Sequence, residues 1–177
     1  MKELSKIEKG FMIASTKERM LLTDFWKNQN QDFLIKKISK VESKDRYDAV
    51  ITSGETDYLV EIKTRRLKRT TYPDSMIEKS KFDYLVDTCI DSNVIPSYWV
   101  FYLDGSVCIW NLNKTVPVWK KKLNPKQTVG NRTKVEKTIG NLPFSEATIY
   151  QIDLTNKNYT TSACAFLEVM FPNNIFN

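Results

Sequence analysis

Two acidic residues, Asp48 and Glu61, are placed by the sequence to face each other across a predicted β-hairpin. The pair Gly54-Glu55 lies midway between them, and glycine in the first position is typical of a two-residue hairpin turn. With this turn, opposite residues have numbers that add up to 109, and Asp48 lies across from Glu61. Two carboxylates in that position repel each other and destabilise the hairpin. The spacing therefore predicts either that water solvates both acids or that they surround a cation.

Lys63 completes a candidate catalytic set. It follows Glu61 by two residues and projects from the same face of the strand, because side chains alternate along a strand. Two acids and a lysine on one face are the minimum apparatus for metal-assisted hydrolysis of a phosphodiester. The alternative is a surface hairpin with a cross-strand ion pair. The three residues together, in this order, favour the hydrolytic interpretation.

Composition restricts the classes of protein that need to be considered. The chain has 177 residues, of which 41% are hydrophobic and 27% are charged. These values are typical of a folded protein, and we expect a single domain over residues 1–177. The absence of histidine excludes Ser-His and Cys-His nucleophile pairs and histidine-bound metal sites.

The expected location is the cytoplasm. The cysteines, Cys89, Cys108 and Cys164, show no C-x-x-C pairing, and we expect them to be reduced structural thiols. In residues 1–14 the only apolar run, 11–14, is too short for a signal peptide or a membrane span. No association with a membrane is expected.

Basic residues are concentrated in two segments. Residues 114–140 hold eight basic residues and one acidic residue, and a second cluster directly follows Lys63. Basic patches attract polyanions and release counterions on binding. A lone charge run is more often a solvated loop, but a run next to the acidic pair favours a nucleic-acid partner. The residues expected to contact nucleic acid are Arg65, Arg66, Lys68, Arg69, Lys120, Lys121 and Lys122.

Hydrophobic periodicity predicts the elements that must position these residues. In chain order they are a helix over 5–29, a strand over 33–41, hairpin strands over 46–53 and 57–65, a helix capped by Asp74 or Ser75 and ending near Ile90, a hairpin over 97–111, a turn-rich basic segment over 117–140, a strand over 147–154, and a helix or strand over 163–170. Asp104-Gly105 is expected to form the turn of the later hairpin and to pair Trp99 with Trp110. This order predicts an α/β sandwich with a mixed sheet.

With these elements, the chain resembles the PD-(D/E)xK nuclease superfamily, which includes restriction enzymes and Holliday-junction resolvases. The resemblance covers residues about 15–103 and rests on Asp48 in the second strand and the E-x-K tripeptide Glu61-Ile62-Lys63 in the third. Tyr47 replaces the proline of the motif, as in many members. The resemblance implies a restriction-endonuclease-like fold, with a central mixed β-sheet flanked by helices.

The resemblance also implies roles for individual residues. Asp48, Glu61 and the backbone carbonyl of Ile62 would bind Mg²⁺ or Mn²⁺, hard cations that take oxygen ligands. Lys63 would orient or activate the attacking water and stabilise charge on the phosphate, and the sequence leaves open whether it acts as a base or through its charge. The helix glutamate that many members carry corresponds to Glu18.

Lys81 is a further catalytic candidate. On a helical wheel it lies in the apolar arc near Ile77, Tyr84 and Leu85. One interpretation is that its stem lies along the core while the amine reaches water. The other is that the amine reaches toward the scissile phosphate, since the helix after the third strand lines the cleft in this superfamily.

The sequence therefore predicts a Mg²⁺-dependent DNA endonuclease, resolvase-like and from a phage or other mobile element. DNA is the expected partner, and a homodimer is a candidate assembly. The first alternative is a non-catalytic nucleic-acid-binding module on the same fold, which gives no reason for two opposed carboxylates. The second is a dimeric scaffold or inhibitor, for which the basic clusters give no support.

Overall fold

The computed structural model describes residues 16, 18–25, 33–39, 45–126 and 133–152. Residues 18–25 are helical. The elements that follow are β1 (Phe33–Ile38), β2 (Ala49–Ser53), β3 (Thr56–Arg65), η1 (Arg69–Thr71), β4 (Asp74–Glu78), α2 (Lys79–Cys89), β5 (Val94–Tyr102), β6 (Ser106–Asn111), β7 (Val118–Pro125), β8 (Lys134–Pro143), η2 (Phe144–Glu146) and β9 (Thr148–Gln151). No helix within the described ranges is long and apolar enough to cross a membrane.

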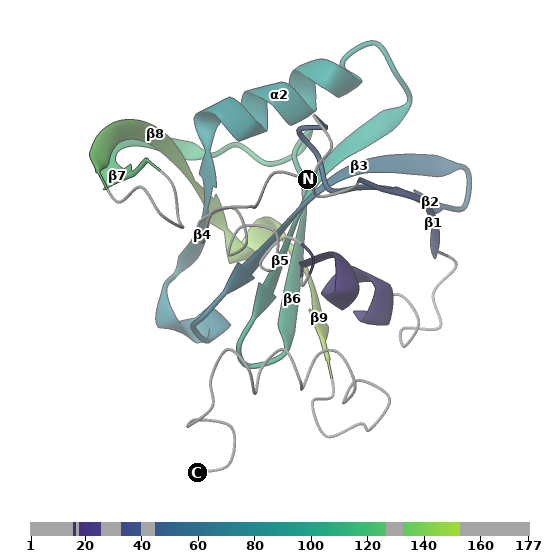
Figure 1. Ribbon diagram of the computed structural model, residues 1–177, viewed down its shortest axis with the longest axis horizontal. Helices are drawn as coiled ribbons and strands as arrows, with labels where there is room; N and C mark the ends of the chain where they lie inside the picture. Colours follow the sequence, from purple (N-terminus) through teal and green to yellow (C-terminus); the bar gives the residue numbers. More distant parts are fainter. Residues whose placement is uncertain (1–15, 17, 26–32, 40–44, 127–132, 153–177) are drawn as a thin grey trace, which may run out of the picture.

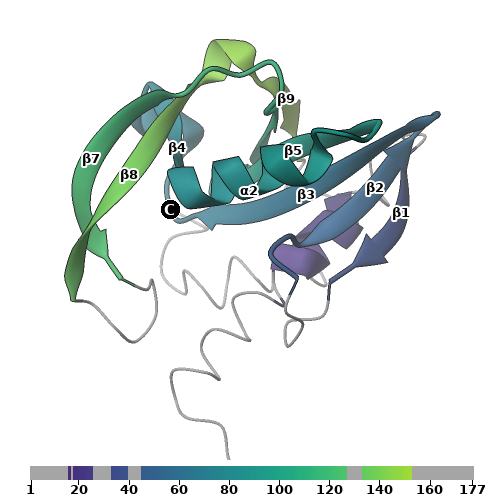
Figure 2. The ribbon, with the colours of Figure 1, turned by 90° about the horizontal axis from the view of Figure 1, so that it is seen from above.

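A six-stranded mixed sheet forms the centre of the molecule (Figure 1). Its strand order is β1-β2-β3-β5-β6-β9. β3 and β5 run parallel, and the other neighbouring strands are antiparallel. Figure 2 shows α2 and the helical residues 18–25 on opposite sides of β3. The predicted fold class, an α/β protein with a central mixed sheet flanked by helices, is confirmed.

Alternation along the central strands gives each helix its own core. On β3, Leu59 belongs to the same buried cluster as Leu85 of α2. The next residue, Val60, projects from the opposite face and belongs with Ile62 to the cluster that contains Leu22. Both faces of the sheet are therefore covered at β3.

Phe25 anchors the N-terminal helical residues to the sheet. Its ring makes edge-to-face contacts with Trp99, Phe101 and Tyr150, at centroid distances of 5.9, 5.9 and 5.5 Å. Each such contact contributes about 0.5–1.5 kcal/mol beyond the burial of apolar area. This packing fixes the position of Glu18, which lies seven residues earlier on the same helical segment.

The predicted register of the first hairpin is confirmed. Val50 pairs with Leu59 and Ser53 with Thr56, so that paired numbers add up to 109. Gly54 lies in the turn with a φ of 57°, in the left-handed region that glycine adopts without a Cβ penalty. The turn therefore sets the position of Asp48 relative to Glu61.

The predicted helix start at Asp74 or Ser75 is wrong. Residues 74–78 form β4, which pairs with β8, and α2 begins at Lys79. Ser75 and Ile77 are buried while Met76 is exposed, an alternation of period two that the helical wheel did not detect. Pairing with a distant strand therefore overrides the local capping signal.

The segment 117–140 is also not turn-rich where the structure describes it. β7 and β8 pair over residues 118–125 and 134–141 and form a second, three-stranded sheet with β4. Figures 1 and 2 both show β7 and β8 at the end of the molecule opposite to β1. Lysine-rich edge strands are common because the charges oppose edge-to-edge aggregation.

The later hairpin is present, but its register differs from the prediction by one residue. Tyr98, not Trp99, pairs with Trp110. The turn contains three residues, 103–105, and Gly105 takes a φ of 79° at its last position, which shifts the pairing by one. A shift of one residue places successive side chains on opposite faces, so Trp99 and Trp110 belong to different cores.

The other predicted elements fall partly outside the described residues. The strands predicted over 33–41 and 147–154 are present as β1 and β9, and of the helix over 5–29 the structure describes residues 16 and 18–25. Residues 163–170 and Cys164 lie outside the described part of the chain. Cys89 and Cys108 are buried free thiols, as predicted, and burial raises the pKa of Cys108 to about 12.

Substitution of Gly140 by alanine should destabilise the second sheet. A Cβ at this position would lie 2.7 Å from Pro117 Cβ and from Trp119 Cζ3. Overfilling of a packed contact costs about 1–3 kcal/mol, which the free energy of unfolding in urea would measure. Gly54→Asn is the control, because a Cβ there has no neighbour within 4 Å and asparagine tolerates positive φ. An unchanged stability of Gly140→Ala would contradict the described packing of Trp119 on β8.

Candidate active site

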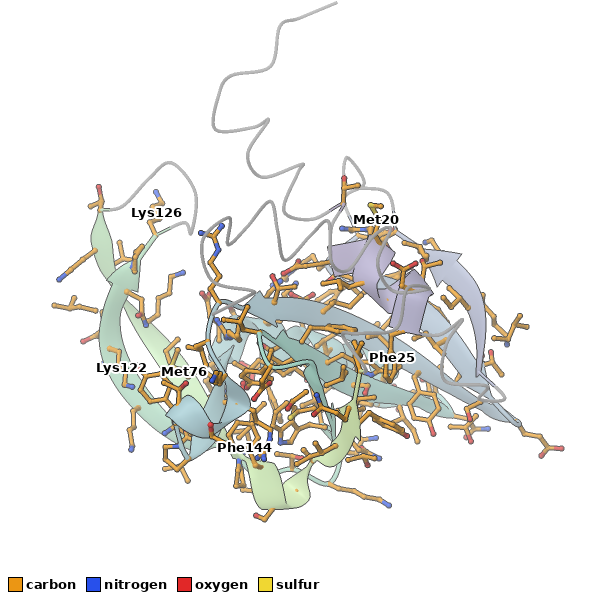
Figure 3. All side chains as sticks on the ribbon, turned by 90° about the horizontal axis from the view of Figure 1, so that it is seen from below. Met20, Phe25, Met76, Lys122, Lys126 and Phe144 are labelled. Atoms are coloured by element: carbon orange, nitrogen blue, oxygen red, sulfur yellow. The ribbon has the colours of Figure 1, made fainter. Side chains whose placement is uncertain are left out.

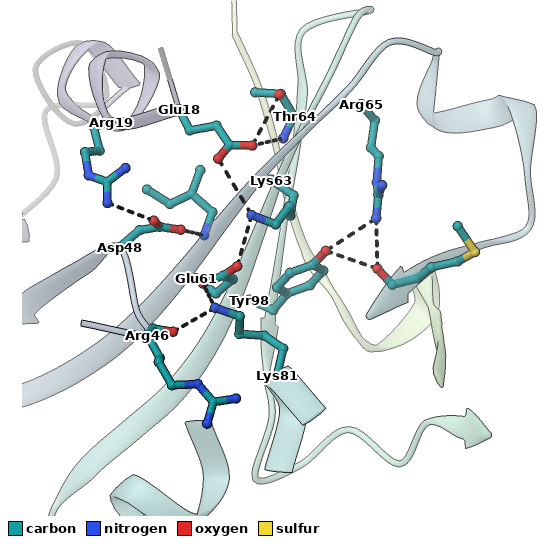
Figure 4. Close-up of polar contacts among 12 residues, drawn as sticks. Glu18, Arg19, Arg46, Asp48, Glu61, Lys63, Thr64, Arg65, Lys81 and Tyr98 are labelled. Carbon is teal, nitrogen blue, oxygen red and sulfur yellow. Dashed lines mark hydrogen bonds and ion pairs between the residues drawn. The ribbon is translucent and has the colours of Figure 1, made fainter. Parts of the chain in front are cut away.

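The candidate site forms at the N-terminal end of β2, beyond which β3 continues without a paired strand on that side. β3 has ten residues and β2 has five, and their pairing ends where Ala49 meets Val60. Beyond this point two side-chain carboxylates accept the backbone N–H groups of β3 (Figure 4). Asp48 Oδ2 accepts the N–H of Ile62 at 2.8 Å, and Glu18 Oε1 accepts that of Thr64 at 3.1 Å. Acids from two distant segments therefore replace a missing strand.

Asp48 is held from three directions. Its backbone N–H donates at 2.8 Å to the carbonyl of Val60, the residue that also pairs with Ala49. Its Oδ1 lies 3.2 Å from Nη2 of Arg19, and the Nε of Arg19 donates to the carbonyl of Ser39. Asp48 is only 8% exposed, so its carboxylate has little contact with solvent.

Glu61 is the most enclosed acid of the site, and both of its oxygens bind ammonium groups. Lys63 Nζ lies 3.0 Å from Oε1, and Lys81 Nζ lies 2.8 Å from Oε2. Lys81 also donates to the carbonyl of Arg46 at 2.7 Å, and Lys63 lies 3.7 Å from Oε2 of Glu18. Together with the ion pair of Asp48 and Arg19, the site holds three acids and three cations and has no net formal charge.

Burial and mutual repulsion act on the acids. Burial raises the pKa of Glu18 above its ordinary value, and the charges of Asp48 and Glu61 add to the effect. Burial likewise raises the pKa of Asp48, with Glu61 as the next cause. Raised pKa values of both carboxyls mean that their ionised forms are held at a cost, which an additional cation would reduce.

The pKa of Lys63 is raised even though its ammonium group is buried. Desolvation by itself lowers the pKa of the ammonium, but the negative charges of Glu61, Glu18 and Asp48 outweigh it, and the pKa is raised. Lys63 therefore keeps its proton at neutral pH in this arrangement. Its charge, rather than a capacity to accept a proton, is what it offers at the site.

The oxygen donors fit a hard divalent cation by their chemistry. Asp48 and Glu61 supply buried carboxylates, and the N–H of Ile62 points toward Asp48. Because the N–H and C=O of one strand residue point to the same side, the Ile62 carbonyl is directed there too. In the arrangement described, however, each carboxylate is paired with a cation of the chain. No group of three or more His, Cys, Asp or Glu among the described residues is arranged to hold a metal ion.

The structure brings together all five residues that were predicted as catalytic: Asp48, Glu61, Lys63, Lys81 and Glu18. Lys81 does not simply extend into water, because its amine is bound to Glu61 and its side chain is 28% exposed. Glu18, identified from the sequence by a loose match to a helix position, lies directly against β3. Ion pairs link Glu18, Lys63, Glu61 and Lys81, and Asp48 lies beside them on the backbone N–H of Ile62; their catalytic roles are proposals.

The residues predicted to contact nucleic acid are more dispersed. Arg65 Nη2 donates to the Met76 carbonyl at 3.0 Å, and the Arg69 guanidinium lies over the Phe144 ring. Arg66 and Lys68 lie on the segment after β3. Lys120, Lys121 and Lys122 lie on β7, in the second sheet. In Figure 3, Lys122 and Lys126 lie along the β7–β8 sheet, across the molecule from Phe25.

Sequence analysis missed three residues of the site. Arg19 and Arg46 lie close to predicted residues, Arg19 directly after Glu18 and Arg46 two positions before Asp48, and their charge was the available signal. Tyr98 pairs in register with Glu61, and its hydroxyl donates to the Met76 carbonyl at 3.0 Å. Nothing local marks Tyr98, because its position depends on the parallel pairing of β3 and β5.

Comparison with known proteins finds a partial similarity. No family model and no curated protein matches the chain. Among solved structures, the chain is similar to Hjc, a Holliday junction resolvase from the archaeal hyperthermophile Archaeoglobus fulgidus. The match covers 56% of this chain and 76% of Hjc, at 17% sequence identity and a TM-score of 0.42.

Glu18→Gln should stabilise the protein at neutral pH. Because the folded-state pKa of Glu18 is raised, its ionisation cost is absent below the unfolded value near 4.5 and fully present above the folded value. For each tenfold change in the acid dissociation constant, this cost is about 1.4 kcal/mol. Urea unfolding of the parent and the variant between pH 4 and pH 8 should show a difference in stability that grows with pH and favours the variant.

The amide of glutamine retains an acceptor for the Thr64 N–H, whereas Glu18→Ala removes it. The alanine variant should therefore be less stable than the glutamine variant at every pH. A parent protein more stable than Glu18→Gln at pH 8 would contradict the described electrostatics.

Proposed function

We propose that this protein is a metal-dependent nuclease that hydrolyses phosphodiester bonds in DNA, on a restriction-endonuclease-like fold. The observation that carries the proposal is the convergence of two acids and a lysine at the end of β2. Asp48 binds the backbone next to Glu61, and Glu61 binds Lys63 at 3.0 Å. Two buried acids beside a protonated lysine are suited to a hard cation and a phosphate.

Each residue of the site would have a separate role in the hydrolysis. Asp48, Glu61 and the Ile62 carbonyl would hold Mg²⁺ or Mn²⁺, which supplies positive charge to the phosphate and lowers the pKa of a bound water. Lys63, which keeps its proton, would stabilise the charge that develops on the phosphate oxygens. Glu18 fixes the Lys63 ammonium and closes the edge of β3.

The test is an assay of the purified protein on branched, double-stranded and single-stranded DNA, with Mg²⁺, with Mn²⁺ and with EDTA. Cleavage that requires the divalent cation supports the proposal. Binding of DNA without cleavage under every condition would favour the non-catalytic alternative.

Glu61→Gln and Lys63→Met should each lower the cleavage rate about 10²–10³-fold. Both changes act on the chemical step, while phosphate contacts elsewhere on the surface maintain DNA binding. Cleavage rates and DNA affinity would be measured on the same preparations. Lys36→Met is the matched control, because Lys36 pairs with Asp57 on the hairpin outside the network. Parent-like cleavage by both site variants would place the active site elsewhere.

The basic residues of β7 are proposed to contact the DNA backbone. Trp119 packs edge-to-face on Phe82 at 5.3 Å and lies under the ammonium of Lys79, and both of these residues are close to Lys81 on α2. β7 therefore lies against the helix that carries a residue of the site. Strand alternation places Lys121 on the face of Trp119 and directs Lys120 to the other face.

Changing Lys120, Lys121 and Lys122 together to alanine should weaken DNA binding and flatten its salt dependence. Each phosphate contact that is lost lowers the log–log slope by about 0.9 on duplex DNA. Titrations at several salt concentrations would measure the slope. Lys121→Ala compared with the Lys120→Ala/Lys122→Ala double variant identifies the face that binds. A slope identical to that of the parent for the triple variant would remove these residues from the binding surface.

A further inference from the structure

The cationic side chains of the site bind the carboxylate oxygens that a divalent cation would need as ligands. Oε1 of Glu61 is bound by Lys63 and Oε2 by Lys81, at 3.0 and 2.8 Å. Asp48 is engaged through Oδ1 by Arg19 and through Oδ2 by the Ile62 N–H. Figure 4 draws these contacts as dashed lines. Both oxygens of Glu61 are already bound by ammonium groups, so a divalent cation that coordinates Glu61 has to displace one of them.

Lys81 differs from the other two cations in that it combines a single carboxylate partner with a partly exposed side chain. Lys63 lies between two carboxylates, those of Glu61 and Glu18. The Arg19 guanidinium binds Asp48 and a backbone carbonyl, and its side chain is only 12% exposed. Lys81 has one carboxylate and one neutral carbonyl as partners, on a flexible four-carbon stem that is more exposed than Arg19. Lys81 is therefore the cation that leaves at the lowest cost.

An anionic partner would draw Lys81 toward solvent. Arg46, whose carbonyl accepts from Lys81, is exposed, and its guanidinium lies 4.4 Å from the centre of the Tyr84 ring. A phosphate bound at this rim would find a second charge in Arg46 and would compete with Glu61 for Lys81.

We propose that Lys81 is an internal competitor of the divalent cation for Glu61, and that a DNA phosphate relieves this competition by binding Lys81. The inference rests on the proposed function and adds its regulation: the free protein binds the metal weakly, and DNA and metal strengthen each other's binding. Such coupling is reciprocal by thermodynamic necessity, and coupling between two sites commonly amounts to about 5- to 150-fold in affinity.

The experiment measures Mn²⁺ binding by isothermal titration calorimetry, without DNA and with a short duplex, which is examined on a gel afterwards for cleavage. Lys81→Met keeps the length of the side chain and removes its charge. It should bind Mn²⁺ about 5- to 150-fold more tightly than the parent without DNA. The parent should gain affinity when the duplex is added, and Lys81→Met should gain little.

Two further variants make the result specific. Lys79→Met removes a charge from the same helix without touching Glu61, since Lys79 pairs with Asp83, and it should bind Mn²⁺ like the parent. Lys81→Gln keeps a donor for the Arg46 carbonyl and should behave like Lys81→Met, which covers the case that the methionine variant folds poorly.

The outcomes separate the inference from the proposed function. Equal or weaker Mn²⁺ binding by both Lys81 variants without DNA, in a parent that does bind Mn²⁺, overturns the inference alone. The same gain in Lys79→Met would show a general effect of charge and would also overturn it. Absence of Mn²⁺ binding by every protein, with and without DNA, overturns both the inference and the proposed metal-dependent function.

Discussion

The candidate site depends on one property of the sheet: β3 is longer than its neighbour β2. Backbone N–H groups that lie near the protein interior must find acceptors, and β2 provides none beyond Ala49. Asp48 and Glu18 supply the missing acceptors, to Ile62 and Thr64. A requirement of the backbone thus brings two carboxylates to the edge of β3, next to Glu61. Burial of a third acid at that point would be unfavourable without cations, and Lys63, Lys81 and Arg19 meet this need.

The packing of the two helices determines which cations are present. The helical residues 18–25 carry Glu18 and Arg19 and are fixed by Phe25 in the core on one face. α2 carries Lys81 and is fixed by Leu85 in the core on the other face. Side chains from both helices reach the edge of β3, because β2 does not cover that edge beyond Val60. The site is therefore built from residues of both helices and of the sheet between them, and no single segment of the chain contains it.

The second sheet gives α2 its position and its charged surroundings. β4 leads directly into α2, and β8 pairs with β4 and carries β7 on its other side. Trp119 of β7 packs against Phe82, and its ring occupies the space where a side chain at position 140 would lie. The strand that carries Lys120, Lys121 and Lys122 is thus packed against the same helix that carries Lys81. This packing connects the candidate site with the basic strand, and it gives the described part of the basic segment a structural role that a solvated loop would not have.

The sequence by itself determined the features that depend on near neighbours. The register of the first hairpin follows from Gly54, because a short turn with positive φ joins two strands of this pattern. The E-x-K spacing places Glu61 and Lys63 on one face because side chains alternate. The mixed character of the fold follows from the order of helical and strand periodicities. These are local rules, and they identified Asp48, Glu61 and Lys63 as candidates.

Tertiary structure decided what depends on distant pairing. Residues 74–78 became a strand because β8 supplies hydrogen-bond partners, an interaction that outweighs the capping tendency of Asp74 and Ser75. Trp99 and Trp110 lie on opposite faces because a three-residue turn shifted the register. Arg19, Arg46 and Tyr98 entered the site because the chain brings together segments that are far apart in sequence. Long-range contacts decide which charges surround a buried acid, and no periodicity in the sequence records them.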